Sequence, residues 1–180
     1  MRITGGAWAS RRLAATPKGR GVRPTPDALR EQAFAVLGPH LDGANFLDVF
    51  AGTGVNSLEA LSRGAARAAL VEWARGSAEL IRRNLSALVV SRDRAELLVL
   101  PWERAIPALA SMGWQCSVAW CDPPFDGWEE GPLALARARE RGVLVPDARV
   151  VLEAPPRREV SVPGFEVVRE LRGAVLLRAT

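Results

Sequence analysis

The strongest constraint on the fold is an apolar run that ends at two glycines, between residues 46 and 54. The run reads Phe46-Leu47-Asp48-Val49-Phe50-Ala51-Gly52-Thr53-Gly54. It has the character of a buried strand, and the spacing of Val55, Leu58 and Leu61 after it predicts a helix. The glycines accept backbone angles closed to other residues and let a ligand approach the main chain. Strand, glycine turn and helix in this order predict a binding pocket at the carboxyl end of a parallel strand.

Two kinds of ligand suit such a pocket. Dinucleotides are bound by Gly-x-Gly-x-x-Gly, but Ser57 stands at the third glycine position and weakens that interpretation. S-adenosylmethionine carries an ammonium and a sulfonium and no phosphate, so an acidic residue before the turn, here Asp48, favours it. A plain strand-to-helix turn with a capping aspartate is the remaining interpretation. For S-adenosylmethionine, we expect pocket contacts from Asp48, Phe50, Ala51, Gly52, Thr53 and Gly54.

Strands and helices alternate along the rest of the chain. Strands are expected at 68–71, 96–100, 117–121 and 149–152, with helices at 75–88, from 102 to about 112, and at 132–141. The tail, with strands near 165–169 and 174–178, is expected to form a hairpin. This order predicts an α/β, Rossmann-like fold with helices on both faces of a mostly parallel seven-stranded sheet and an antiparallel edge.

The next two strand ends offer further cofactor contacts. Glu72 lies 20 residues beyond Gly52, where an acidic side chain can accept hydrogen bonds from both ribose hydroxyls. Trp73 can cover a purine face, although a solvated strand end with a core tryptophan is the plainer interpretation. The following strand ends at Pro101-Trp102, where Trp102 is a further candidate cofactor contact.

The expected fourth strand ends at Asp122-Pro123-Pro124-Phe125, which we assign to catalysis. Two prolines stiffen the turn and remove two N–H donors, so the Asp122 carboxylate and the Pro123 carbonyl face outward as acceptors. Phe125 offers a ring face for stacking. An exocyclic amine on a base needs these parts, because its two N–H groups seek acceptors and its ring seeks a stacking partner. A mere proline turn is the alternative.

Positive charge is concentrated at the start of the chain. Residues 1–30 hold seven basic residues and one acidic residue, whereas the remainder carries a net charge of −2. We divide the chain into a basic arm or hairpin at 1–24 and a domain at 25–180, whose first helix begins with Thr25 as N-cap. A basic arm on a near-neutral body suggests a polyanionic partner, although a solvated arginine-rich tail would look the same. The basic residues are Arg2, Arg11, Arg12, Lys18, Arg20, Arg23 and Arg30.

Together these motifs resemble the bacterial methyltransferases that modify a guanine N2 in small-subunit ribosomal RNA. The resemblance covers essentially the whole chain and is most specific in two N-terminal segments, Arg2-Ile3-Thr4-Gly5-Gly6 and Arg23-Pro24-Thr25-x-Asp27-x-x-Arg30-Glu31. It continues through the glycine turn, residues 58–64, Asn84-Leu85 and the Asp-Pro-Pro-Phe motif. It implies a class I methyltransferase that uses S-adenosylmethionine, with ribosomal RNA or a small-subunit particle contacting the arm and the first helix.

The sequence departs from this family at the adenine side of the pocket. Pro101-Trp102 replaces the usual acidic or amide residue, and no second acidic residue follows Glu72. With this departure, the adenine is expected to be held by the Trp102 backbone and by packing. Two other functions therefore stay open. One is a non-catalytic RNA-binding protein on a methyltransferase fold, which the intact Asp48, Glu72 and Asp122 argue against. The other is a DNA adenine-N6 methyltransferase, for which 180 residues leave no room for a separate base-reading domain.

Other functional classes find little support in the sequence. No apolar stretch approaches the length needed to cross a bilayer, and no secretory leader is evident. The single histidine and the two cysteines, Cys116 and Cys121, form no zinc-type cluster, so we expect no metal. The cysteines, five apart on one strand, are expected to be core residues on opposite faces. We expect a cytoplasmic monomer.

Overall fold

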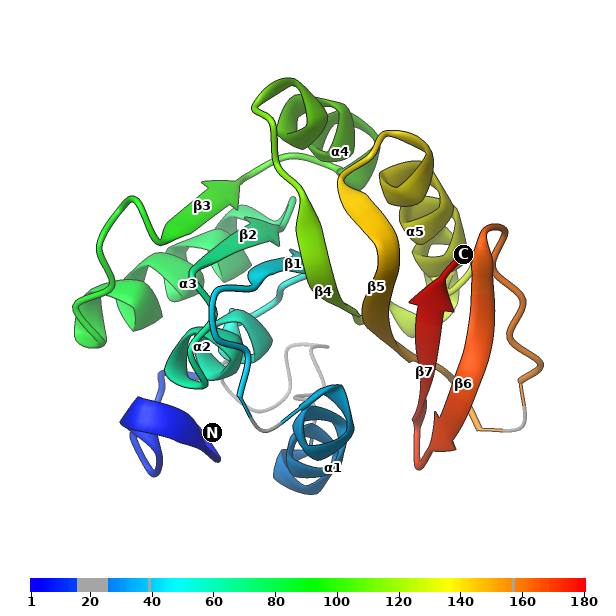
Figure 1. Ribbon diagram of the computed structural model, residues 1–180. Coiled ribbons are helices and arrows are strands. Elements are labelled where there is room, and N and C mark those ends of the chain that lie inside the picture. Colours follow the sequence, from blue (N-terminus) through cyan, green and yellow to red (C-terminus); the bar gives the residue numbers. More distant parts are fainter. Residues whose placement is uncertain (16–25, 39, 157) are drawn as a thin grey trace.

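Seven strands form one twisted sheet in the computed structural model, which describes residues 1–15, 26–38, 40–156 and 158–180 (Figure 1). Their spatial order is β3-β2-β1-β4-β5-β7-β6. The strands are β1 (Asn45–Val49), β2 (Arg67–Val71), β3 (Ala95–Leu98), β4 (Cys116–Cys121), β5 (Leu144–Glu153), β6 (Phe165–Leu171) and β7 (Ala174–Ala179). The first five are parallel, and β7 pairs antiparallel with both β5 and β6. The predicted mostly parallel sheet with an antiparallel edge is confirmed.

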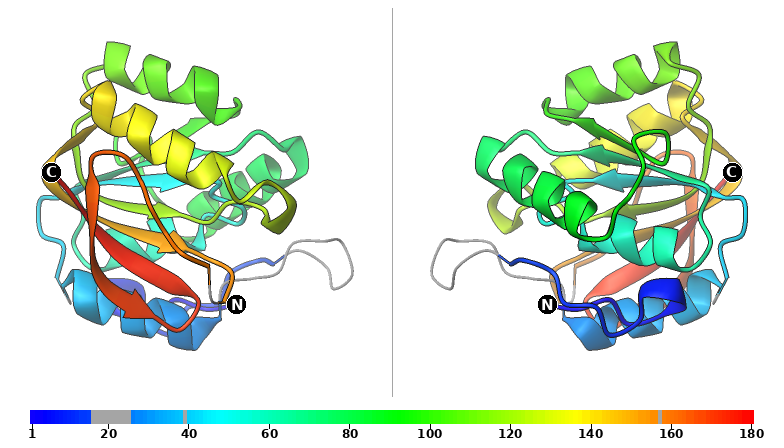
Figure 2. Two further views of the ribbon diagram at one scale, coloured as in Figure 1. Left: turned by 90° about the vertical axis from the view of Figure 1, so that its right-hand side faces the viewer. Right: turned by 90° about the vertical axis from the view of Figure 1, so that its left-hand side faces the viewer.

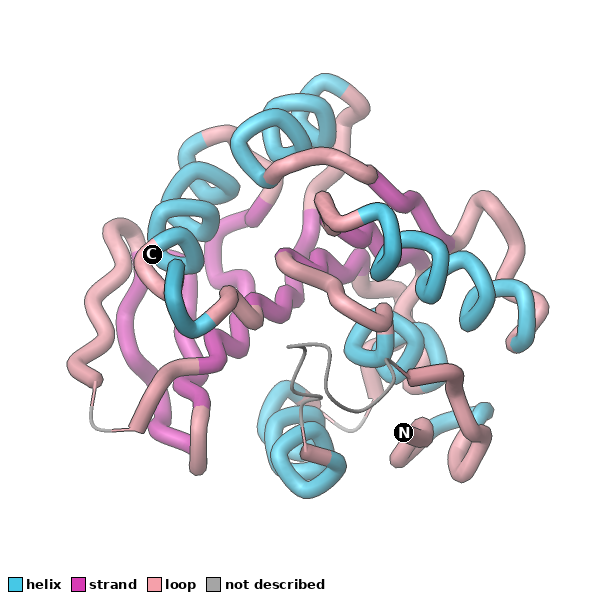
Figure 3. The backbone as a smooth tube through the Cα atoms, turned by 180° about the vertical axis from the view of Figure 1, so that it is seen from behind, coloured by secondary structure: helices cyan, strands magenta, loops and turns pink. Residues whose placement is uncertain are grey.

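Helices cover both faces of the sheet, as Figure 2 shows from two sides. They are α1 (Asp27–Leu37), α2 (Val55–Ser62), α3 (Arg75–Ala87), α4 (Trp102–Ser111) and α5 (Glu130–Glu140). One apolar cluster joins α4 and α5 to the sheet, and a second joins α1, α2 and α3 to the opposite face. The view from behind shows these layers with the strands in magenta and the helices in cyan (Figure 3).

The parallel strands are nearly continuous apolar runs because both of their faces are covered. Four of the five residues in β1 and in β2 are buried, and β1 and β2 pair in register from Asn45 with Arg67 to Val49 with Val71. Central strands β1 and β4 also pair in register, with Val49 opposite Cys121. The loops that follow β1, β2 and β4 therefore leave the same edge of the sheet side by side.

Two local expectations need correction. Helix α1 begins at Asp27 with Pro26 as its N-cap, one residue later than predicted, and the expected cap Thr25 lies outside the described residues. Cys116 and Cys121 are free and buried as expected, but both pack in the cluster beneath α4 and α5. The pairing of β4 with β5 shifts between Cys116 and Val118, and this shift breaks the simple alternation of faces.

The N-terminal arm is folded against α2. Instead of the two expected strands, it forms a single antiparallel bridge between Arg2 and Arg12, which encloses the short 3-10 helix η1 (Gly6–Trp8). Ile3 and Leu13 are buried in a small cluster with Val55, Leu58 and Leu88, from α2 and the end of α3. The described part of the arm is thus a packed element that shares an apolar cluster with α2 and the end of α3.

The edge strand β6 is largely exposed, and its pairing with β7 shifts between Val167 and Arg169. In the described parts of the chain, no helix is long and apolar enough to cross a membrane.

Candidate active site

The glycine turn after β1 has an unusual backbone. Phe50, Gly52 and Gly54 all have positive φ angles, of 66°, 56° and 75°. Such an angle costs a non-glycine residue about 1–2 kcal/mol, so the backbone at Phe50 is strained. A Cβ atom on Gly54 would also lie 3.2 Å from Leu70 Cδ2 and 3.3 Å from Ile81 Cγ1. Gly54 is therefore required both for its φ angle and for the close approach of α2 to the sheet and α3.

Asp48 lies beneath the turn rather than on its surface. Its side chain has no solvent exposure, and its Oδ2 accepts hydrogen bonds from Ser57 N at 3.1 Å and from Ser57 Oγ at 2.7 Å. Its Oδ1 is buried without a hydrogen-bond partner among the described residues. Burial raises the pKa of Asp48 to about 7, against the lowering effect of the Ser57 bonds. The sequence did not indicate this role for Ser57, which stands in the place of a third glycine.

Glu72 fastens the glycine turn to the end of β2. Its Oε2 accepts from Gly52 N at 2.8 Å, and its Oε1 accepts from Ala74 N, also at 2.8 Å. The side chain is 7% exposed, and burial raises its pKa against these two hydrogen bonds. Each carboxylate oxygen has a second lone pair that can accept from a ligand hydroxyl.

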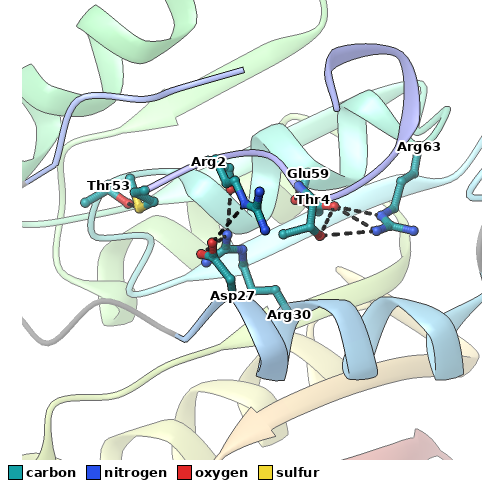
Figure 4. Close-up of polar contacts among 8 residues, drawn as sticks. Arg2, Thr4, Asp27, Arg30, Thr53, Glu59 and Arg63 are labelled. Carbon is teal, nitrogen blue, oxygen red and sulfur yellow. Dashed lines mark hydrogen bonds and ion pairs between the residues drawn. The ribbon is translucent and has the colours of Figure 1, made fainter. Parts of the chain in front are cut away.

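Thr53, between the two glycines, is held from the side of the arm. Its carbonyl accepts from Asn84 Nδ2 at 3.0 Å, and its hydroxyl donates to Met1 Sδ at 3.4 Å. Figure 4 shows this sulfur beside Thr53. In the sequence, Asn84 stands out only as part of the family resemblance, because its partners Thr53 and Ala14 lie 31 and 70 residues away along the chain.

A small cavity of about 110 Å³ opens beside the turn, at the ends of β2 and β3. Its walls are mostly apolar and include the predicted contacts Phe50, Trp73 and Trp102; its two acidic lining residues are Glu103 and Glu130. Trp102 Nε1 donates to Glu130 Oε2 at 3.1 Å, which fixes a carboxylate from α5 at the cavity. Glu130 was missed by sequence analysis because it lies 28 residues beyond Trp102 in another element.

The Asp122–Phe125 segment starts directly beside the glycine turn. Asp122 N donates to Val49 O at 3.2 Å, so the loop after β4 is fastened to the last residue of β1. Pro123 is buried against α5, where a Cβ atom on Gly131 would lie 2.8 Å from its Cγ. Phe125, by contrast, is 65% exposed. The segment therefore has one buried, closely packed end and one aromatic ring that faces solvent.

The expected basic residues fall into three groups. Arg11 and Arg12 are exposed, as phosphate contact requires, and Arg2 is partly engaged by Asp27 at 3.3 Å. Arg30 is fully buried and donates to Arg2 O at 2.6 Å and to Asp27 Oδ1 at 2.8 Å (Figure 4). This burial corrects the expectation of an exposed cation: Arg30 holds the arm on α1 and is not accessible to solvent. The remaining three predicted contacts, Lys18, Arg20 and Arg23, lie outside the described residues.

Two further contacts hold the arm on α2. Buried Glu59 accepts from Thr4 N and Thr4 Oγ1, both at 2.7 Å, and pairs with Arg63 at 2.8 Å (Figure 4). A Cβ atom on Gly6 would lie 1.9 Å from Ser62 O, and φ at Gly6 is +76°. The opening Thr-Gly-Gly motif is thus explained by how closely the arm packs on α2. In the described part of the chain, no group of three or more His, Cys, Asp or Glu side chains could hold a metal ion.

Comparisons with known proteins identify relatives along nearly the whole chain. Residues 1–177 match the family model described as Conserved hypothetical protein 95. Ribosomal RNA small subunit methyltransferase D of Escherichia coli K12 is 39% identical over 155 residues, covering 86% of this chain and 74% of that protein. The protein of the same name from Haemophilus influenzae is 30% identical over 165 residues, covering 91% and 83%. The solved structure called "Putative methyltransferase yhhF from Escherichia coli" superposes with a TM-score of 0.80 at 29% identity, covering 99% of this chain and 97% of that chain.

Proposed function

Because the chain belongs to the family described as Conserved hypothetical protein 95, we propose that it methylates small-subunit ribosomal RNA, as the names of its relatives indicate for them. The proposed reaction transfers a methyl group from S-adenosylmethionine to the exocyclic N2 amine of a guanine. A ribosomal substrate also agrees with the expected cytoplasmic location.

The observation that carries the proposal is the direct link between the two loops of the site. Asp122 N is bonded to Val49 O, so a base held by the Asp122–Phe125 segment would lie next to a cofactor held by the glycine turn. The other features agree with this arrangement. The first-turn N–H groups of α2 could bind the carboxylate of S-adenosylmethionine. The second lone pairs of the Glu72 carboxylate could accept hydrogen bonds from its ribose hydroxyls.

Buried Asp48 contributes to the pocket in two ways. Through Ser57 it holds the first turn of α2 in place beneath the glycines. When ionised, it also adds negative potential in a low-dielectric position, which favours a cationic ligand. Its orphaned Oδ1 agrees with a site built to stabilise positive charge nearby.

The cavity at the ends of β2 and β3 suits the adenine. Apolar walls from Phe50, Trp73 and Trp102 would enclose its ring. Its exocyclic amine needs an acceptor, and Glu130, held by the Trp102 indole, supplies a carboxylate there. We therefore assign to Glu130 the contact that the family usually makes with an acidic or amide residue at the Pro101-Trp102 position.

Transfer itself requires mainly positioning. Asp122 and the Pro123 carbonyl would accept the two amine hydrogens, which draws the nitrogen toward tetrahedral geometry and frees its lone pair. Bound S-adenosylmethionine would supply a sulfonium methyl group. The amine lone pair would form the new C–N bond while the C–S bond breaks and its electron pair stays on sulfur. The methylated amine then releases one proton to solvent. Most of the rate gain comes from holding the amine in line with the methyl group.

The decisive experiment is single-turnover transfer of labelled methyl to small-subunit ribosomal RNA by an Asp122→Ala variant. We expect a loss of about 10²–10³ in rate, or roughly 3–4 kcal/mol, with nearly unchanged affinity for S-adenosylmethionine. Asp126→Ala is the matched control, since Asp126 is an exposed carboxylate on the same loop. Near-wild-type transfer by Asp122→Ala would overturn the mechanism.

Two parallel assays decide between the proposal and its rivals. A wild-type chain that binds RNA but neither binds S-adenosylmethionine in titration nor transfers methyl would be a non-catalytic RNA-binding protein. Transfer to adenine in a DNA duplex, with none to ribosomal RNA, would identify a DNA methyltransferase instead.

A further inference from the structure

Asn84 is a buried amide at an unusual place. It lies on the inward stripe of α3 with Ala78 and Ile81, and only 1% of its surface is exposed. Burying an amide in an apolar layer is costly unless its donors and acceptor are all bonded. An alanine or leucine would fill such a position without the free-energy cost of removing an amide from water, so packing alone does not explain the asparagine.

The hydrogen bonds of Asn84 join two distant segments of backbone. Its Oδ1 accepts from Ala14 N at 2.9 Å, and its Nδ2 donates to Ala14 O at 3.2 Å and to Thr53 O at 3.0 Å. The amide therefore pairs with Ala14 as a neighbouring strand would, and with the same nitrogen it holds the glycine turn. Ala14 belongs to the arm and lies 70 residues away, whereas Thr53 lies 31 residues away.

The position of Ala14 in the chain shows what Asn84 connects to the glycine turn. It lies two residues after exposed Arg12 and shortly before the stretch 16–25, which carries Lys18, Arg20 and Arg23 in the sequence. At the other end of the arm, the Met1 sulfur accepts a hydrogen bond from the Thr53 hydroxyl. Met1 thus contacts Thr53, the residue between the two pocket glycines, directly, whereas Ala14 reaches it through Asn84.

The turn has little freedom to respond to the cofactor on its own. Glu72 holds Gly52 N from the β2 side, and Asp48 holds the first turn of α2 from beneath. Two residues hold Thr53 itself: Asn84 from α3, which also bonds the arm at Ala14, and Met1 from the arm. A change in the position of the arm at Ala14 is therefore passed to the carbonyl of Thr53 through a single side chain.

We propose that Asn84 is a positioning residue that couples the arm to the glycine turn, so that RNA bound by the arm and S-adenosylmethionine bound at the turn strengthen each other's binding. The inference rests on the proposed function, in which the arm binds RNA and the turn binds the cofactor. Linkage makes the coupling reciprocal: whatever factor RNA adds to cofactor affinity, the cofactor adds to RNA affinity.

The test is the affinity for S-adenosylhomocysteine, measured by titration with and without a saturating small-subunit ribosomal RNA transcript. This product is used because it cannot be turned over. In the wild-type chain we expect RNA to tighten its binding about fivefold or more, within the usual range of such couplings. In Asn84→Leu, which removes all three hydrogen bonds, we expect the factor to fall below about twofold. Asn84→Ser, which is too short to bridge both backbones, provides a milder second variant if the first folds poorly.

Ser62→Ala is the matched control. The Ser62 hydroxyl is also buried and also bonds the arm twice, accepting from Trp8 N at 2.8 Å and donating to Gly5 O at 2.6 Å. Both of these bonds stay between α2 and the arm, away from the glycine turn, so their loss should weaken the arm's attachment and leave the coupling factor at the wild-type value. A merely structural role for Asn84 would lower thermal stability in both variants without separating their coupling factors.

The outcomes are distinct. Asn84 variants that keep the wild-type factor would overturn the role of Asn84, and a wild-type factor of one would overturn the coupling while leaving both binding functions in place. The RNA-binding role of the arm is tested separately by replacing Arg11 and Arg12 with glutamine. If that double variant keeps the wild-type RNA affinity and salt dependence, the arm does not bind RNA, and the coupling falls with it.

Discussion

The two loops that form the site are held in different ways. The glycine turn is fixed by hydrogen bonds to buried side chains. Glu72 accepts from Gly52 N, Asp48 accepts from Ser57 N, and Asn84 donates to Thr53 O. The Asp122–Phe125 segment is held by a main-chain bond from Asp122 N and by the packing of Pro123 on Gly131, and its outer end is exposed. The glycine turn is thus stiffened by hydrogen bonds, whereas the Asp122–Phe125 segment is stiffened by the rings of its two prolines.

This difference follows from what each loop is proposed to bind. A cofactor is a small ligand of fixed structure, so its pocket can be built from buried polar groups such as Asp48, Glu72 and Asn84, which other parts of the fold hold in place. A base in a large RNA must enter from outside, so its loop has to stay open while it keeps its shape. Prolines provide that stiffness, and because they have no backbone N–H they leave no donor that would need a hydrogen-bond partner.

The largest expected effect concerns Asp48, the most deeply buried acid of the turn. Its pKa is about 7 in the folded chain, against an ordinary value of 3.8, so the folded state holds an extra proton between these pH values. The free energy of unfolding should therefore fall as pH rises from about 4 to about 7, by about 4 kcal/mol for a shift of this size. Asp48→Asn should remove this fall, as urea denaturation at pH 5 and pH 8 would show. An unchanged pH profile in that variant would rule out Asp48 as its source, and Asp126→Asn serves as an exposed control.

Next in size is the loss of Glu72. Glu72→Ala removes the hydrogen bond to Gly52 N and the proposed acceptor for the ribose, so affinity for S-adenosylmethionine should weaken by about 1.5–3 kcal/mol. Isothermal titration measures this change directly. Glu79→Ala, an exposed glutamate on α3 that pairs with Arg82, is the control and should bind normally. Equal affinity in the two variants would exclude Glu72 from the pocket.

A smaller effect is expected on the acceptor side from Gly131→Ala. The new methyl group would lie 2.8 Å from Pro123 Cγ, and overpacking of this kind costs about 1–3 kcal/mol. Because the strain falls on the catalytic loop, we expect methyl transfer to slow about tenfold while cofactor affinity stays constant. Gly76→Ala is the control, since its added methyl group would meet no atom within 4 Å. Loss of cofactor binding in the Gly131 variant would show that the two loops are not held independently.

The smallest effect should come from Phe125, a residue that is already 65% exposed. Phe125→Ala should cost about 1 kcal/mol, at the lower end of base stacking, and weaken RNA binding as well as transfer. Phe125→Trp should keep activity, because either ring presents a flat face. Competition binding with ribosomal RNA would measure both variants. If the alanine variant binds RNA as tightly as wild type, the base stacks elsewhere.

Local sequence patterns predicted the order of the strands and helices well, because each depends on residues close together in the chain. The apolar run before Gly52, the spacing in α3 and the double proline after β4 are all of this kind. The ends of the strands also showed where Asp48, Glu72 and Asp122 would gather, since parallel strands leave their carboxyl ends at one edge. The direction of the Asp48 side chain was not predictable, because it depends on whether Ser57 or a ligand occupies the space above it.

Contacts between distant residues were beyond the reach of the sequence. Asn84 meets Ala14 and Glu130 meets Trp102 only because separate elements are packed together. Arg30 was predicted wrongly for a different reason. Counting the charges of residues 1–30 assumes that every arginine is exposed, whereas Arg30 is enclosed between α1 and the arm. The shift in β4 between Cys116 and Val118 likewise depends on its partner β5 and has no signature in β4 alone.

The irregular edge strand β6 affects how readily the protein aggregates through the open edge of its sheet. Val167 and Val168 are 48% and 53% exposed, so two neighbouring valines face solvent where a regular strand would turn one of them inward. A flat row of such residues would invite another β-strand to add to the sheet and start aggregation. Here the pairing shift beside Val167 interrupts the row, and the flanking charges of Glu166, Arg169 and Glu170 discourage an incoming chain. The open side of the sheet is thereby protected without a covering helix.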